Sequence, residues 1–151
     1  MIEFRVNLKF TCIISLICVL FSICVQYILH EVPCLLCLYT RIGFIVVAIL
    51  CFVTTYCRGL SWLPFFALVA LMCLSFYHLG VENHWWVAPE SCKMVLPTLE
   101  QLNAKALPSD RPPCDKVGFQ IFGISMTLFS FVTTSFLMWL HSIALALKLH
   151  K

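Results

Sequence analysis

Long apolar stretches separated by short polar segments predict four membrane-spanning helices. A helix needs about 20 apolar residues to cross the hydrocarbon core of a bilayer. Stretches of this kind occupy 10–29, 35–56, 60–79 and 119–141. The predicted fold is therefore an all-α membrane protein, in which a single domain over 1–151 forms a four-helix transmembrane bundle.

The segments between the predicted spans set the topology. Residues 30–36 and 81–116 would form two connections on one side of the membrane, so both termini would lie on the other side. Basic residues are densest in the short tails and in one tight turn, where the positive-inside bias operates. These residues are Arg5, Lys9, Arg58, Lys148 and Lys151. Both termini are therefore expected in the cytoplasm.

The long connection at 81–116 carries a helical pattern of its own. Apolar residues recur there at helical spacing, at Val95, Leu99, Leu102 and Ala106. This stripe predicts a short helix lying on the membrane surface. A solvent-exposed loop helix with one apolar face fits the same pattern.

The composition restricts the chain to membrane proteins. Hydrophobic residues make up 62% of it and charged residues 11%, whereas soluble domains average about 45–50% and about 25%. The net charge of +3 is small and the basic residues are scattered, so nothing indicates binding to nucleic acid. The chain also contains 10 cysteines, and their positions divide them into two groups.

Most of the cysteines lie inside the predicted spans or at a cytoplasmic end, where a free cysteine behaves as a small hydrophobic residue. This group is Cys12, Cys18, Cys24, Cys51, Cys57 and Cys73. The others form two pairs, Cys34 with Cys37 at the start of the second span and Cys92 with Cys114 in the long connection. Because two crossings separate the pairs, any four-span topology places both on the same side. With cytoplasmic termini this is the oxidising side, where disulfides persist.

The first pair lies in a setting that favours redox chemistry. A helix that begins near Cys34 directs its unpaired N–H groups and the positive end of its dipole at the thiols. Cys34, Cys37 and Arg41 then stand at i, i+3 and i+7, on one face of that helix. Arg41 is the only formally charged residue within any predicted span, and we expect it to stabilise negative charge on a sulfur or on a reduced acceptor. The alternative is an arginine that reaches the lipid headgroups.

The second pair allows several interpretations. Cys92 and Cys114 would form a permanent disulfide worth about 3 kcal/mol in chain entropy, or would join the first pair in a four-thiolate zinc site. An oxidising compartment disfavours zinc because it pairs the thiols. Neither interpretation explains why the other pair lies at the mouth of a membrane-embedded helix. Thiol–disulfide exchange between the pairs does explain it, and electrons collected at Cys34 and Cys37 would leave to a lipid-soluble acceptor.

At these residues the chain resembles the disulfide bond formation protein B (DsbB) family of bacterial inner membranes. The resemblance covers nearly the whole chain, with four spans, the motif Pro-Cys-x-x-Cys-x-x-x-Arg at 33–41 and a second cysteine pair before the last span. Segments 77–82, 113–115 and 122–125 are similar to family segments as well. The resemblance implies an oxidase of a periplasmic DsbA-like protein of thioredoxin fold. Its cofactor would be a membrane quinone (ubiquinone or menaquinone) without a metal, and both cysteine pairs would face the periplasm.

The resemblance also implies a role for each cysteine. Cys92 would form the mixed disulfide with the partner protein, and Cys114 would relay to Cys34. Cys37 would be the thiolate that faces the quinone, with Arg41 beside the ring. At rest we expect one disulfide in each pair, while the cysteines in the spans stay free.

Further candidates for the quinone site lie near the outer end of the third span. They are His78, Glu82 and His84, placed where a proton donor for quinone reduction would be useful. A histidine in such an interface is more often simply hydrated.

Two other functions are alternatives. A vitamin K epoxide reductase-like enzyme also couples thiols to a quinone within a helix bundle, but its Cys-x-x-Cys belongs to the last helix, after the loop cysteines. A non-catalytic four-span scaffold with structural disulfides would show neither bound quinone nor thiol-dependent quinone reduction.

Overall fold

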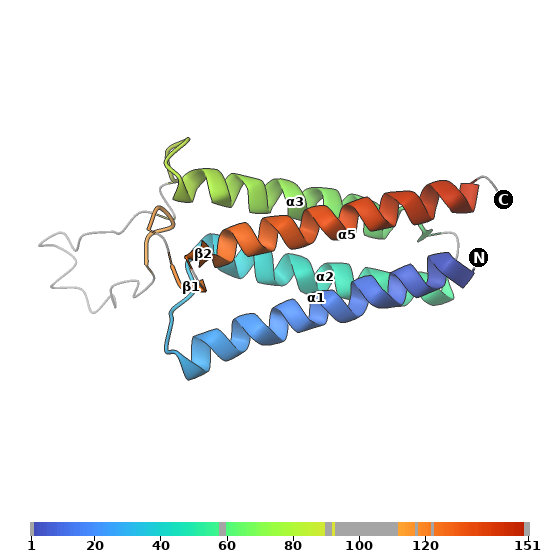
Figure 1. Cartoon of the computed structure of the whole chain (residues 1–151), viewed down its shortest axis with the longest axis horizontal. Helices are drawn as coiled ribbons and strands as arrows, with labels where there is room; N and C mark the ends of the chain where they lie inside the picture. Colours follow the sequence, from blue (N-terminus) through green and yellow to red (C-terminus); the bar gives the residue numbers. More distant parts are fainter. Residues whose placement is uncertain are drawn as a thin grey trace, which may run out of the picture.

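Four long helices lie side by side in the computed structural model, which describes residues 2–57, 60–89, 92, 112–116, 118–121 and 123–149 (Figure 1). Within these residues the helices are α1 (Ile2–Ile28), α2 (Leu35–Tyr56), α3 (Leu63–Glu82) and α5 (Met126–Leu149). A short antiparallel ribbon of β1 (Gln120–Ile121) and β2 (Ile124–Ser125) precedes α5. The predicted all-α, four-helix architecture is confirmed.

The helices form a closed ring. Helix α1 packs against α2 and α5, and α3 packs against the same two helices. Both chain termini lie at one end of the bundle, and the α1–α2 connection and the ribbon lie at the other end (Figure 1). We call this second end the loop end.

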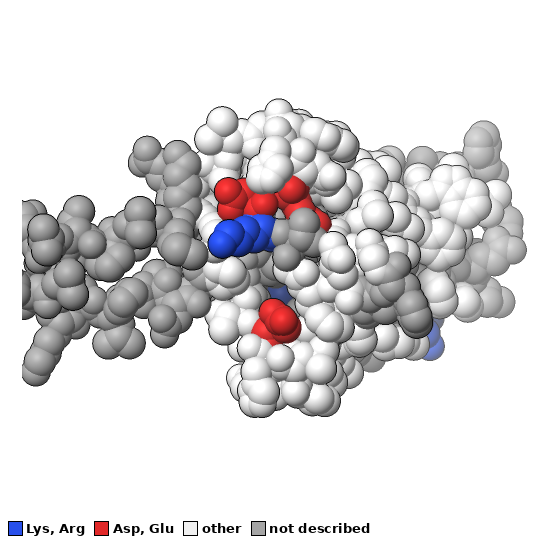
Figure 2. Space-filling model, turned by 60° about the vertical axis from the view of Figure 1, so that its left-hand side comes forward, with Lys and Arg blue, Asp and Glu red and all other residues white. Residues whose placement is uncertain are grey.

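All four helices are long and apolar enough to cross a membrane. Their outward residues are apolar and exposed, as at Phe52, Phe66 and Val132, whereas polar Thr134 and His141 are completely buried. A bundle whose outer surface contacts lipid has this distribution. The lipid solvates apolar side chains, and polar side chains find hydrogen-bond partners in the bundle interior. On the face shown in Figure 2, charged side chains gather toward the loop end and most of the remaining surface is uncharged.

Local sequence determines where the helices begin. Cys34 has an extended backbone and caps α2, because its sulfur accepts the backbone N–H of Cys37. Pro64 occupies the first turn of α3, where a missing N–H costs nothing. The Ser125 hydroxyl accepts the Leu128 backbone N–H at 3.2 Å and so caps α5.

The observed helix ends differ in part from the predicted spans. Helix α2 has the bounds 35–56 that were predicted, but α1 begins at Ile2 instead of 10. Helix α3 ends at Glu82, so 81 and 82 belong to a helix and not to the loop. Helix α5 begins at Met126 and not at 119, because the ribbon turns at Gly123 (φ 78°) before the Ser125 cap. The predicted surface helix around 95–106 lies outside the described residues.

Candidate functional site

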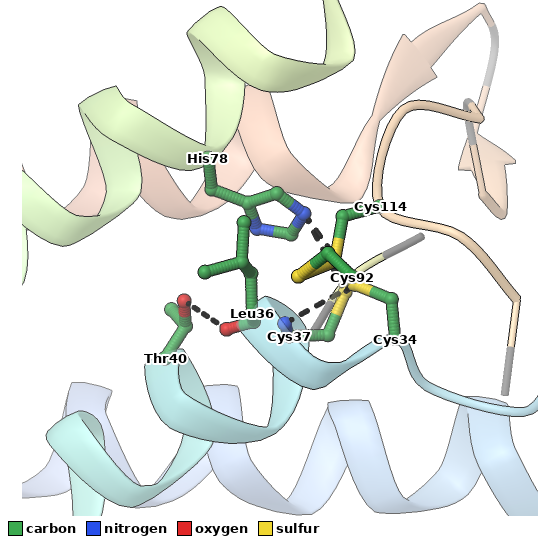
Figure 3. The surroundings of a disulfide bond; sticks show 7 residues. All are labelled: Cys34, Leu36, Cys37, Thr40, His78, Cys92 and Cys114. Atoms are coloured by element: carbon green, nitrogen blue, oxygen red, sulfur yellow. Dashed lines mark hydrogen bonds between the residues drawn. A yellow bond between two sulfur atoms is a disulfide. The ribbon is translucent and has the colours of Figure 1, made fainter. Parts of the chain in front are cut away.

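The first cysteine pair is fixed at the start of α2, at the loop end of the bundle (Figure 3). The sulfur of Cys34 accepts the Cys37 backbone N–H at 3.3 Å, and the two sulfurs lie 2.9 Å apart. Cys34 is buried and Cys37 is half-buried. Both are free thiols in this structure, so the Cys34–Cys37 disulfide expected at rest is not the state observed. The sulfur atoms are nevertheless close enough for that bond to form with little movement.

A histidine from α3 lies directly against this pair. Nε2 of His78 is 3.5 Å from the Cys34 sulfur and 4.0 Å from the Cys37 sulfur. Figure 3 shows the imidazole pointing from α3 toward the thiols. The ring is 4% exposed, so it is not a hydrated interface histidine. His78 therefore belongs to the site.

The other two candidates from this region lie differently. Glu82 is buried one turn beyond His78 on α3, and His84 is exposed in the turn that follows, with a left-handed backbone (φ 57°). Among the described residues, neither Glu82 nor His84 lines the two cavities described below. The structure thus brings His78 into contact with the thiols, and it brings Glu82 close enough to interact electrostatically with Cys37.

The surroundings of Cys34 favour its thiolate. The hydrogen bond with the Cys37 thiol lowers the pKa of Cys34 well below its usual range, and His78 and the Cys37 backbone N–H lower it further against the opposing effect of burial. A dithiol in this geometry therefore carries its charge mainly on Cys34. That Cys37 is the thiolate that faces the quinone stays a prediction. Cys34 occupies the cap of the helix, where its sulfur accepts the Cys37 backbone N–H and also contacts the Cys37 thiol and His78.

The second cysteine pair is a disulfide, as predicted. Cys92 and Cys114 are bonded, their Cα atoms are 5.3 Å apart, and the Cys114 backbone N–H donates to the Cys92 carbonyl at 3.1 Å. Both residues are buried in one cluster with Cys34, Leu36 and Val81. Figure 3 shows the disulfide beside Cys34 and Cys37. Two pairs that are far apart in sequence therefore meet at one place.

The remaining cysteines are free thiols, as predicted. A four-cysteine zinc site is incompatible with this structure, because Cys92 and Cys114 are bonded to each other. Cys34, Cys37 and His78 do present three ligand atoms within 4.8 Å of one another. Structural zinc sites use four protein ligands, so these three alone would leave one position open.

Arg41 lies one turn deeper than Cys37 on α2 and is held by α1. Its Nε and Nη2 atoms donate to the Ser22 hydroxyl at 3.2 and 2.9 Å, Nη2 donates to the Ser22 carbonyl at 3.2 Å, and Nη1 donates to Oε1 of Gln26 at 2.7 Å. The guanidinium is therefore fixed between two helices and is not a freely snorkelling group. Sequence analysis missed Ser22 and Gln26. A glutamine inside an otherwise apolar span was the signal that could have found them.

An apolar cavity, which we call the inner cavity, borders this site within the bundle. Phe21, Phe44 and Phe129 line it together with Cys37 and Arg41. Phe21 and Phe129 are also exposed on the outer surface of α1 and α5. The inner cavity therefore opens between these two helices, on the side that would contact lipid.

A second, more polar cavity, the outer cavity, lies toward the loop end. Cys34, Cys37 and Arg41 line it, together with the charged residues Glu31 and Lys116. Figure 2 shows acidic and basic side chains around a hollow at this end. Both cavities are lined by Ser22, Cys37, Arg41, His78, Met126 and Thr127. The reactive groups therefore stand at the junction of a polar cavity and an apolar one.

Comparison with known proteins decides the family. The sequence model of the family described as disulfide bond formation protein DsbB matches residues 5–144, nearly the whole chain. The chain belongs to the DsbB family. No curated protein and no solved structure matches it.

Membership makes this DsbB-family chain a multi-pass membrane oxidoreductase of disulfide bond formation. It favours DsbB over the vitamin K epoxide reductase-like alternative, in agreement with the order of the cysteine motifs. Membership of this family also argues against a non-catalytic scaffold.

Proposed function

We propose that this protein reoxidises the dithiol of a periplasmic DsbA-like protein of thioredoxin fold and passes the electrons to a membrane quinone. One observation carries the proposal: the Cys92–Cys114 disulfide and the Cys34–Cys37 dithiol share one buried cluster, and Cys37 also lines an apolar cavity. Exchange between the pairs connects the aqueous side to the membrane interior.

The exchange begins with both pairs oxidised. A partner thiolate attacks Cys92, which forms a mixed disulfide and releases Cys114. The Cys114 thiolate attacks Cys34, which breaks the Cys34–Cys37 bond. The second partner thiol then closes the partner disulfide and frees Cys92, which attacks Cys114 and releases Cys34. Two electrons have now moved from the partner to Cys34 and Cys37.

The environment of Cys34 supports the last step of this relay. The lowered pKa of Cys34 suits a leaving thiolate, which is its role when Cys92 attacks Cys114.

The inner cavity supplies a site for the electron acceptor. Its phenylalanine side chains suit a flat apolar ring, and the Arg41 charge suits oxygens that become negative on reduction. A quinone bound there, ubiquinone or menaquinone, would take up two electrons as the Cys34–Cys37 disulfide re-forms. Cys37 is the sulfur that faces this cavity, and His78, which contacts both sulfurs, is placed to receive a thiol proton.

The proposed location is the bacterial inner membrane, with both termini cytoplasmic and both cysteine pairs periplasmic. Both termini lie at the end opposite to the cysteines (Figure 1). The oxidising periplasm would maintain the Cys92–Cys114 bond, and the basic tails suit the cytoplasmic side.

The test is a quinone-reduction assay on purified protein in lipid nanodiscs, with a reduced DsbA-like protein and a soluble quinone analogue. The wild type should reduce quinone in step with partner oxidation, and Cys37→Ala and Cys114→Ala should not. Addition of a metal chelator should leave the rate unchanged. A wild type that oxidises no partner, or that loses activity with the chelator, would overturn the proposal.

A further inference from the structure

The Arg41 guanidinium, which lines both cavities with Cys37, is bound only by neutral groups among the described residues. Arg41 donates to the Ser22 hydroxyl, the Ser22 carbonyl and the Gln26 side-chain oxygen, at distances between 2.7 and 3.2 Å. Within the part of the chain that the structure describes, Arg41 forms no ion pair. Glu31 lines the outer cavity with Arg41, but it is not among the partners of the guanidinium.

Neutral partners have a specific electrostatic consequence. A guanidinium has five N–H donors in a planar fork, and oxygens without formal charge can satisfy them while the net positive charge remains. A carboxylate in the same place would cancel most of that charge. The charge of Arg41 thus remains available to a group that becomes negative nearby.

The two partners are placed to fix the direction of the fork. Ser22 and Gln26 stand at i and i+4 on α1, so they present oxygens one turn apart on the same helix face. Ser22 also lines both cavities, and Gln26 lines the outer one. The fork is therefore held at the junction of the cavities, on a residue one helix turn from Cys37.

We propose that Ser22 and Gln26 are positioning residues, which orient the Arg41 guanidinium toward the electron acceptor and keep its charge uncompensated. This inference rests on the proposed function. On this inference, part of the affinity for the electron acceptor comes from Ser22 and Gln26, although both residues are neutral.

The test uses Gln26→Glu, which keeps the side-chain shape and adds a carboxylate beside Nη1, together with Gln26→Met and Ser22→Ala. We expect Gln26→Glu to raise the KM for a soluble quinone analogue about tenfold. Gln26→Met and Ser22→Ala should raise it less. The first half of the reaction, mixed-disulfide formation with the partner at Cys92, should be unchanged in all three.

Matched controls separate positioning from damage to the fold. Ser15→Ala removes a buried hydroxyl from the same helix, and Gln120→Glu adds the same charge at an exposed position in β1. Both should keep the wild-type KM. If Gln26→Glu does not fold, Gln26→Met and Ser22→Ala still decide the question, because neither introduces a charge.

A double-mutant cycle with Arg41→Met makes the test specific. Once the charge is absent there is nothing to position, so Gln26→Glu should raise KM no further in that background. The inference is overturned if Gln26→Glu raises KM equally with and without the Arg41 charge. It is also overturned if Gln26→Glu leaves KM unchanged although Arg41→Met impairs the enzyme. Either result leaves the proposed function intact. Absence of quinone reduction by the wild type overturns both.

Discussion

Nε2 of His78 lies 3.5 Å from the sulfur of Cys34, although the two residues are 44 positions apart in the chain. The contact joins α3 to the cap of α2 and places a buried imidazole against the thiol with the lowered pKa. It therefore links the bundle fold directly to the redox chemistry.

The first prediction concerns the pH dependence of this thiol. With its pKa lowered, Cys34 stays a thiolate at pH values where an ordinary cysteine is protonated, and it loses its charge only as the pH falls through the lowered value. His78→Leu should raise the pKa and slow alkylation of the reduced pair at Cys34 about threefold to tenfold near pH 6. Residue-resolved mass spectrometry measures the rates. His84→Leu is the control. Equal rates of Cys34 alkylation in His78→Leu and the wild type at each pH would show that the contact does not activate Cys34.

The second prediction concerns the relay. Cys114→Ala should leave Cys92 able to capture the partner as a stable mixed disulfide, because no second thiol of the pair remains to displace the partner. Non-reducing electrophoresis with a reduced DsbA-like protein and an oxidant detects the adduct. Accumulation through Cys114 in a Cys92→Ala variant instead would mean that the entry and relay roles are reversed.

The third prediction concerns the charge of Arg41. Arg41→Met keeps much of the apolar stem but removes the cation, so it should raise the KM for quinone, slow turnover, or both, while Cys92–Cys114 still forms. Arg41→Lys should recover part of the loss, since it restores the charge but not the planar fork that meets Ser22 and Gln26. Quinone reduction at several quinone concentrations measures both variants. Wild-type kinetics in Arg41→Met would remove Arg41 from the reaction.

The fourth prediction concerns the turn that follows α3. A Cβ at Gly80 would occupy the space of the Trp86 ring, which stacks on Tyr77 and donates its indole N–H to the Tyr77 carbonyl at 2.9 Å. Gly80→Ala should therefore lower the free energy of unfolding by about 1–3 kcal/mol. Thermal unfolding in detergent measures it, with Gly118→Ala as the control because a Cβ there meets nothing within 4 Å. Equal unfolding midpoints for the two variants would rule out this packing role.

Much of the architecture can be predicted from the sequence because the bilayer imposes a simple length and polarity rule. Apolar stretches predict four helices, and the single intramembrane charge, Arg41, indicates the helix face that bears the first pair. The start of α5 escapes this rule, since the ribbon before it is as free of charged residues as the membrane-spanning part of the helix, Met126–Leu147. Its start follows the turn at Gly123 and the hydrogen bond that the Ser125 hydroxyl accepts from the Leu128 backbone.

The details of the site depend on tertiary contacts that the local sequence does not encode. His78, Glu82 and His84 are equal candidates in sequence, and only the folded chain distinguishes the buried contact of His78 on α3 from the exposed position of His84 in the turn after that helix. The acidity of Cys34 relative to Cys37 similarly depends on which sulfur accepts hydrogen bonds. Ser22 and Gln26 become visible as part of the site only once α1 is packed on α2.

The most direct test of the account follows the four cysteines through one transfer of electrons. Quinone-free protein with both pairs oxidised would receive one equivalent of reduced DsbA-like partner, and acid quenching with alkylation would then report each cysteine by mass spectrometry. The account predicts an oxidised partner, alkylated Cys34 and Cys37, and an intact Cys92–Cys114 disulfide, with added quinone then closing Cys34–Cys37 again. Reduction that stops at Cys92 and Cys114, with Cys34–Cys37 still bonded, would contradict it.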